Sequence, residues 1–314
     1  EIRRKFLTDT DFRRQYVEFD RDSLADYVAF IASEVKAVSP DSRMGYENVF
    51  LGGFHGGNHT HIWEALHRVS GKEVIARSGN GVYMDCEPRD TLTKMLQIHY
   101  QNSQLPDYVT TRRPEIENLL MVCMGKSVRG TMMEAELDLA LGCNGTSFHS
   151  LCNDTEPLSY ERRYFKALSE ERTYFEALRT WNQTGKTVGL HPVLFDDAYA
   201  VQTIQMEEVI EGENRKRDFN FWGSVPFSAG WGIWATGMPL SFEDDAAYYL
   251  HPDMVPYLTD AEIETLLSKN LMTDGAALAA IGARGYAAAI PAKADPCGLS
   301  TDDAYDRCRH PVTE

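Results

Sequence analysis

The chain has 314 residues, 43% of them hydrophobic, which is enough for one large domain or two ordinary domains with a buried core. Its 31 basic and 47 acidic side chains give a net charge of −16. This charge argues against binding nucleic acid or an anionic membrane through a general electrostatic footprint, and it is compatible with a neutral ligand such as a sugar.

The six cysteines are scattered without a Cys-x-x-Cys pair. Four of them stand in apolar or strand-like surroundings and are interpreted as reduced core residues, because small disulfide scaffolds are far denser in cysteine. Cys297 and Cys308 are spaced so that they could close a terminal loop. No stretch approaches the ~20 apolar residues of a membrane span, so we expect no membrane partner.

Helices and strands alternate along the first 180 or so residues. We expect a helix from Asp22 or Ser23 to Pro40, a strand over 43–51, a helix over 59–69, a strand over 73–77, a helix over 90–100, a strand ending at Glu117, a helix beginning near Ser127, a strand over 145–151 and a helix over 159–181. Gly71 and Gly142 are typical helix-ending residues. The pattern amounts to four β-α units in a row.

The stretch Tyr108 to Asn118, YVTTRRPEIEN, is the most informative part of this series. A β-branched, strand-like run leads to two carboxylates and is followed by a helix, which is how a (β/α) barrel builds its active site at strand ends. Side chains alternate across a strand, so Glu115 and Glu117 are expected on one face and Ile116 on the other.

Four β-α units are half of a (β/α)8 TIM barrel, and half a barrel leaves two open sheet edges. We therefore expect residues 1–200 to be the C-terminal half of a barrel. This half would be part of a fragment whose first half lies upstream, or it would pair with another chain. An open doubly wound sheet is the alternative.

The amino-acid composition changes from about Asp218, where aromatic and small residues become frequent. Thr259 and Glu262 form a capping box before an apolar run, and Asp274 begins another short helix that Gly285 ends. Residues 201–314 are therefore predicted to be the start of a smaller α/β domain with an irregular tail after Pro291.

The order of several segments resembles the second half of a β-galactosidase-type, family 42-like glycoside hydrolase barrel. The segments are SRMGYENV, EVIARSGNGVYMD, RRPEIENLL, GKSVRGTMMEAELDLALGCNGTSFHSL and LLSKNLMTDGAALAAIGARGY. The last one is similar to the start of the flavodoxin-like domain that follows the barrel in that group and often serves oligomerisation. The likeness covers roughly residues 20 to 290.

The resemblance implies a retaining mechanism with two carboxylates, no cofactor and a carbohydrate substrate, with galactoside as the family default. Glu117 then matches the nucleophile, and Glu115 is the second choice. A retaining enzyme needs an ionised carboxylate about 5 Å from a protonated one. Arg112 or Arg113 could keep the nucleophile ionised, although a surface ladder of arginines and glutamates is the plainer alternative.

The acid/base glutamate departs from the family pattern, because the strand that should carry it would precede Glu1. Glu47 and Glu18 are the only carboxylates near enough in order to substitute, and neither lies at the expected place. Without upstream sequence, the isolated chain is expected to bind sugar without efficiently cleaving unactivated glycosides.

Further substrate-binding candidates follow from strand ends and aromatic clusters. They are Arg77, Tyr83, Asp85, Arg113, His149 and Trp222. Tyrosine and tryptophan can stack on a sugar face, while the polar groups take hydroxyl hydrogen bonds. The polar residues could equally fix loops, His149 could be a core histidine, and the tryptophans could pack a domain interface.

Two rival interpretations remain open. His55, His59 and His61 supply three imidazoles within seven residues, enough in number for a metal-dependent hydrolase, although their spacing is not the His-Glu-x-x-His arrangement. A non-catalytic, oligomeric carbohydrate-binding subunit is the other class. We expect a homo-oligomer, or pairing with a missing N-terminal half-barrel.

Overall fold

The structure is a computed structural model that describes residues 2–48, 59–79, 81–86, 88–118, 125–150, 157–185, 187–193, 233, 238–243 and 247–289. The chain separates into two compact units. Unit 1 comprises Glu1–Thr187 and Phe195–Phe227, and unit 2 comprises Val188–Leu194 and Ser228–Glu314. Helices and small parallel sheets make up both units, which confirms the expected α/β class.

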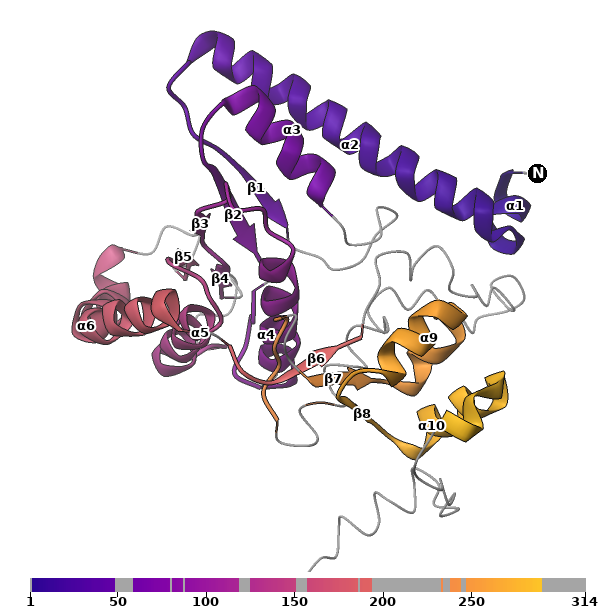
Figure 1. Ribbon diagram of the computed structural model, residues 1–314. Coiled ribbons are helices and arrows are strands. Elements are labelled where there is room, and N and C mark those ends of the chain that lie inside the picture. The colour runs from indigo at the N-terminus through magenta and orange to yellow at the C-terminus, as the bar shows by residue number, and fades with distance from the viewer. Residues whose placement is uncertain are drawn as a thin grey trace, which may run out of the picture. The chain divides into compact units, whose positions relative to one another are not determined.

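Unit 1 alternates helices and strands along the chain (Figure 1). Its described elements are α1 (Ile2–Thr8), α2 (Thr10–Val38), β1 (Met44–Asn48), α3 (Thr60–Ser70), β2 (Val74–Ser78), α4 (Pro88–Ser103), β3 (Thr111–Arg112), β4 (Glu115–Glu117), α5 (Val128–Ala140), β5 (Ser147–His149), the short 3-10 helix η1 (Leu158–Glu161) and α6 (Arg162–Thr184). Each predicted strand and helix of the first 180 residues has a counterpart in this series.

The strands of unit 1 pair in parallel and in the order of the chain. β1 pairs with β2 and β2 with β3, while β4 pairs with β5. The single strand predicted to end at Glu117 is divided into β3 and β4 by Arg113 and Pro114. The chain changes partner there, because the Arg113 N–H donates to the Ala76 carbonyl at 2.8 Å and the Pro114 carbonyl accepts the Ser147 N–H at 3.0 Å.

Helix α2 begins at Thr10, well before the predicted start at Asp22 or Ser23. The carboxylate of Asp9 accepts the Phe12 N–H at 3.0 Å, which satisfies one of the donors that a helix start leaves unpaired. The helix lies along α3 (Figure 1), and several of its large apolar side chains face away from unit 1's core. The exposed ones are Phe19, Tyr27, Phe30, Ile31, Val35 and Val38.

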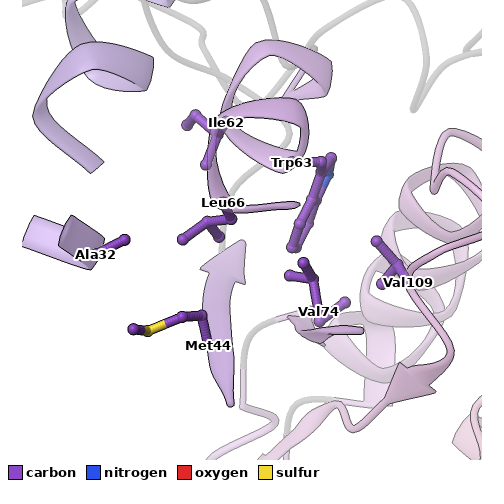
Figure 2. Packing of buried hydrophobic residues seen from close by; sticks show 8 residues of the cluster. Ala32, Met44, Ile62, Trp63, Leu66, Val74 and Val109 are labelled. Carbon is purple, nitrogen blue, oxygen red and sulfur yellow. The ribbon is translucent and has the colours of Figure 1, made fainter. Parts of the chain in front are cut away.

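The core of unit 1 lies between α3 and the first two strands. Trp63 of α3 reaches towards Val74 of β2 (Figure 2) and is 1% exposed, and Ile62 and Leu66 of α3 belong to the same cluster as Met44 of β1. The same cluster also contains Ala32, Ala76 and Val109. Apolar residues at helical spacing meet alternate strand residues, which is the packing that the sequence pattern predicts.

Local signals place several helix ends correctly. Gly71 follows α3 with φ 62°, a left-handed conformation that glycine adopts without strain. The Ser127 hydroxyl accepts the Gly130 N–H at 2.9 Å, so this residue is the N-cap of α5, as predicted.

Unit 2 contains a three-stranded parallel sheet in the order β6-β7-β8. Its described elements are β6 (Leu190–Pro192), β7 (Ala247–Leu250), η2 (Pro252–Tyr257), α9 (Asp260–Leu267), β8 (Leu271–Thr273), α10 (Gly275–Ile281), the π-type turn η3 (Gly282–Tyr286) and η4 (Ala287–Ala289). The capping box of Thr259 and Glu262 is present, and Asp274 caps α10. None of the helices within the described residues is long and apolar enough to cross a membrane.

Candidate active site

Glu115 and Glu117 lie on the same face of β4, and their carboxyl groups share a hydrogen bond. Glu115 is buried and Glu117 is partly exposed, while Ile116, which alternates to the other face, is fully buried. The strand alternation predicted for this stretch is therefore confirmed. Two carboxyl groups in hydrogen-bonding contact near neutral pH favour sharing one proton.

Arg77 connects the pair to a third carboxylate. Its Nη2 lies 2.8 Å from Glu115 Oε1, and its Nη1 lies 3.0 Å from Glu47 Oε2. Glu47 and Arg77 are register partners in the β1–β2 ladder, so the parallel sheet itself places them side by side. The cation that contacts Glu115 and Glu47 is thus Arg77 of β2, whereas Arg112 or Arg113 was the cation considered from the sequence.

The pKa of Glu115 is raised to about 7, chiefly by burial and next by its hydrogen bond to Glu117, while the guanidinium of Arg77 opposes the shift. Glu115 is consequently protonated over much of the range below neutral pH. Its proton can then be donated in a hydrogen bond to the Glu117 carboxylate.

Glu117 has two more polar neighbours. His149 Nδ1 lies 3.2 Å from Glu117 Oε1, and these two residues are register partners in the β4–β5 ladder. The Tyr83 hydroxyl donates to the Glu117 carboxylate; burial and this negative charge raise the pKa of Tyr83. Gly81 approaches closely as well, because a Cβ there would lie 2.7 Å from the Cβ of Glu117.

The cluster is assembled from strand ends. Glu47, Arg77, Glu117 and His149 each occupy the last or next-to-last position of β1, β2, β4 and β5, and Tyr83 lies in the loop after β2. In parallel sheets the carboxyl ends of the strands are where ligands and catalytic groups gather. Six of the residues singled out from the sequence therefore come together: Glu47, Arg77, Tyr83, Glu115, Glu117 and His149.

Three further sequence candidates lie elsewhere. The Asp85 carboxylate accepts the Ser127 N–H at 2.8 Å, and its own N–H donates to the Gly125 carbonyl at 3.0 Å. Asp85 thus fixes the loop that leads into α5, which was the alternative role considered for it. Arg113 is exposed and its side chain lies against Gly145. Glu18, on α2, pairs with Arg21.

The histidine-rich run does not form a converging set in the part of the chain that the structure describes. His61 Nδ1 binds Asp22 Oδ1 of α2 at 2.9 Å, whereas the buried His59 ring packs against Tyr46. Within the described residues, no group of three or more His, Cys, Asp or Glu side chains could hold a metal ion. His55 lies outside those residues.

Other expectations also fall on undescribed positions, namely that of Trp222 and those of the cysteines Cys123, Cys152, Cys297 and Cys308. Of the remaining cysteines, both are free thiols. Cys143 is buried, as interpreted from the sequence, but Cys86 is exposed, so the core interpretation is wrong for that residue.

Sequence reasoning missed one residue that supports the site. Lys94 of α4 is 1% exposed, and its Nζ donates to the backbone carbonyl of Glu115. A lysine within an amphipathic helix is ordinarily interpreted as solvent-exposed, since lysine is almost never fully buried unless it is paired. No local signal in the sequence distinguishes Lys94 from an exposed lysine.

Comparisons of the chain with protein-family models, curated proteins and solved structures gave no significant match.

Proposed function

We propose that this protein is a retaining glycoside hydrolase that acts on a neutral glycoside, with Glu117 as the nucleophile. The observation that carries the proposal is the carboxyl pair at the end of β4, in which Glu117 is held by His149 and Tyr83 and lies against a protonated Glu115. The resemblance of RRPEIENLL to the corresponding segment of family 42-like enzymes supports the same residue.

In this mechanism one carboxylate oxygen of Glu117 attacks the anomeric carbon of the sugar. The bond from that carbon to the glycosidic oxygen breaks, and a covalent glycosyl-enzyme forms that water later hydrolyses. Hydrogen bonds from Tyr83 and from protonated Glu115 orient the Glu117 carboxylate for attack. Arg77 would hold Glu115 in place and reach sugar hydroxyls.

Glu115 and Glu117 are too close to be the acid and the nucleophile of the same step. Retaining enzymes place those two carboxyl groups about 5 Å apart, on opposite sides of the scissile bond, whereas this pair is in direct hydrogen-bonding contact. We therefore assign Glu115 a supporting role and assign the acid/base to no described residue. The carboxylate of Glu47, which the sequence offered as a substitute, lies 3.0 Å from Arg77 Nη1.

The finer architecture that we propose is half of a (β/α)8 barrel followed by a flavodoxin-like domain. Strands that pair in chain order, β1-β2-β3 and then β4-β5, support a singly wound arrangement. A doubly wound sheet reverses its strand order at a switch point, and no reversal occurs among the described strands of unit 1. The expected partners remain a second copy of the chain or an N-terminal half-barrel.

Turnover of activated aryl glycosides tests this proposal, because a good leaving group departs without an acid. A panel of 2,4-dinitrophenyl glycosides of neutral sugars would be hydrolysed, and proton NMR would show that the first sugar released keeps its anomeric configuration. Glu117→Gln should abolish the reaction. Inversion of configuration, or hydrolysis that Glu117→Gln leaves intact, would contradict the proposal.

A second candidate is a non-catalytic carbohydrate-binding subunit. The absence of an assigned acid/base carboxylate among the described residues favours it. Such a protein would bind one of the sugars, as measured by calorimetry, and would release no dinitrophenol from any glycoside of the panel.

A further inference from the structure

A second cluster of charged side chains lies in the interior of unit 1. Lys94 of α4, Lys126 of the loop before α5, and Glu134 and Asp138 of α5 are each no more than 4% exposed. Burying charges is expensive, and removing one partner of such a pair leaves an uncompensated charge. A well-packed apolar replacement of the whole set would often be as stable. Stability alone therefore does not account for this cluster.

Glu134 is the centre of the cluster. Its Oε1 lies 2.5 Å from Lys94 Nζ and accepts the Val82 N–H at 3.3 Å, and its Oε2 binds Lys126 Nζ. Lys94 Nζ also lies 3.3 Å from Asp138 Oδ2. Burial lowers the pKa of Lys94, but the carboxylates of Asp138 and Glu134 outweigh it, so the pKa is raised and the lysine stays charged.

Two segments of the candidate active site are joined by this ion pair. Lys94 donates to the carbonyl of Glu115, which belongs to the backbone of β4, while Glu134 accepts the N–H of Val82, the residue before Tyr83. The backbone that carries the carboxyl pair and the backbone that carries the phenol are thereby connected through the Lys94–Glu134 pair.

The link continues to β5 through a second set of hydrogen bonds. Asn118 donates its backbone N–H to the His149 carbonyl at 3.1 Å and its side-chain Nδ2 to the Tyr164 hydroxyl at 3.0 Å. The Tyr164 hydroxyl in turn donates to the carbonyl of Lys126. The segments that deliver Glu117, Tyr83 and His149 are therefore all attached to the same buried network.

We infer that Lys94 and Glu134 are positioning residues, which hold the end of β4 against the loop of Tyr83 so that Glu117 meets its hydrogen-bond donors. This inference rests on the proposed function for its chemical meaning, but its structural content can be tested without any substrate. Displacing the Glu115 carbonyl should bring the Glu115 side chain closer to water and weaken its contact with Glu117.

The test is a pH titration of Glu115 in Lys94→Met, monitored by 13C NMR of protein labelled at the glutamate carboxyl carbons. The Glu115 signal is assigned by its absence from the spectrum of Glu115→Gln. Loss of the Lys94 charge alone would raise the pKa of a nearby carboxyl, whereas release from burial lowers it. We expect the pKa of Glu115 to fall from about 7 by about one unit or more, because positioning is lost.

Lys126→Met is the matched control, since it removes the same charge from the same Glu134 carboxylate without touching the Glu115 carbonyl. Here the pKa of Glu115 should stay or rise. An unchanged or raised pKa in Lys94→Met, or an equal fall in both variants, would overturn the inference. If Lys94→Met does not fold, Lys94→Gln is titrated in its place, and a chain that folds with neither shows a purely structural requirement, which also overturns it.

A second readout separates this inference from the proposed function. If a fluorinated activated glycoside labels the wild-type protein, its labelling rate should fall about tenfold in Lys94→Met and be nearly unchanged in Lys126→Met. If no glycoside labels the wild-type protein, the proposed function fails, while the NMR titration still decides whether Lys94 positions β4.

Discussion

Both units contain parallel sheets, but the residues at the carboxyl ends of their strands differ. In unit 1 the last or next-to-last residues of β1, β2, β4 and β5 are Glu47, Arg77, Glu117 and His149, which form the pairs Glu47–Arg77 and Glu117–His149, and Arg77 also binds Glu115. In unit 2, β7 ends in the fully buried Leu250, whose carbonyl accepts a hydrogen bond from the hydroxyl of Thr273 on β8. A parallel sheet thus provides a platform, and the residues at its strand ends decide whether the platform carries chemistry.

The two units also differ in how many charged side chains they bury. Every buried arginine, lysine, aspartate or glutamate side chain among the described residues belongs to unit 1: Arg13, Arg21, Lys94, Glu115, Lys126, Glu134, Asp138 and Glu161. Unit 2's described core consists almost entirely of apolar side chains. Because a buried charge is costly, such groups tend to gather where function requires them.

The largest expected effect is on catalysis. Glu117→Gln removes the proposed nucleophile and should lower turnover of an activated glycoside by about 10³-fold or more. The control is Glu264→Gln, the same change at an exposed position of α9 in unit 2, which should leave turnover within about twofold. Equal losses in both variants would mean that the division of roles between the units is wrong.

Glycine-to-alanine substitutions compare how tightly the backbone is packed in the two units. A Cβ at position 81 would lie 2.7 Å from the Glu117 Cβ and 3.2 Å from the Tyr83 ring, so Gly81→Ala should cost about 1–3 kcal/mol in unfolding free energy and reduce turnover. Gly275→Ala on α10 meets nothing within 4 Å and should be neutral or stabilising by up to about 1 kcal/mol. Urea denaturation and the glycoside assay measure both.

The pH dependence of stability should also differ between the wild type and a variant of unit 1. Glu115, which faces Arg77, Glu117 and Glu47, has its pKa raised from 4.5 to about 7, chiefly by burial. The folded state therefore binds this proton more tightly than the unfolded state, and the contribution of Glu115 to the free energy of unfolding falls as pH rises from about 4.5 to about 7. Burial also raises the pKa of Asp138 to about 7, so its contribution to stability falls with rising pH in the same way.

Glu115→Gln, which mimics the protonated acid, should make this decline shallower. Denaturation midpoints at pH 5 and pH 8 measure it, and a decline as steep as that of the wild type would show that Glu115 is not held in its buried position.

The smallest effect is expected in unit 2. Thr259→Ala removes the side-chain N-cap of α9 and, of the two hydrogen bonds from Thr259 that lower the pKa of Glu262, the one donated by the hydroxyl; the backbone N–H still donates the other. It should cost about 1 kcal/mol of stability above the ordinary pKa of a glutamate, and the loss should shrink as pH falls below it. The glycoside assay should be unaffected, and a lowered rate would couple α9 to the site.

Local chemistry explains which parts of the fold could be predicted. The N-cap at Ser127, the left-handed Gly71 and the capping box at Thr259 depend on residues within a few positions of one another, and all three are confirmed. The start of α2 was missed because Asp9 caps a helix whose first turns carry no regular apolar stripe. Pro114 divides the predicted strand, since proline has no N–H to donate to a ladder.

Strand alternation and the order of the strands allowed part of the candidate site to be predicted. Glu115 and Glu117 were expected on one face, and Arg77 and His149 at neighbouring strand ends, because parallel strands in sequence order bring their carboxyl ends together. The choice of Arg77 over Arg113 as the cation beside Glu115 depends on how β2 and β4, which belong to different sheets, approach each other, and the sequence does not specify this. Lys94 and Glu134 meet only through packing between α4 and α5.

Covalent trapping tests the central claim most directly. The protein is incubated with 2-deoxy-2-fluoro glycosides that carry activated leaving groups, and the labelled peptide is identified by mass spectrometry. We expect a single glycosyl label on Glu117, which is absent in Glu117→Gln and retained in Glu264→Gln. A label on any other residue, or no label from any sugar on protein shown to be folded, would contradict it.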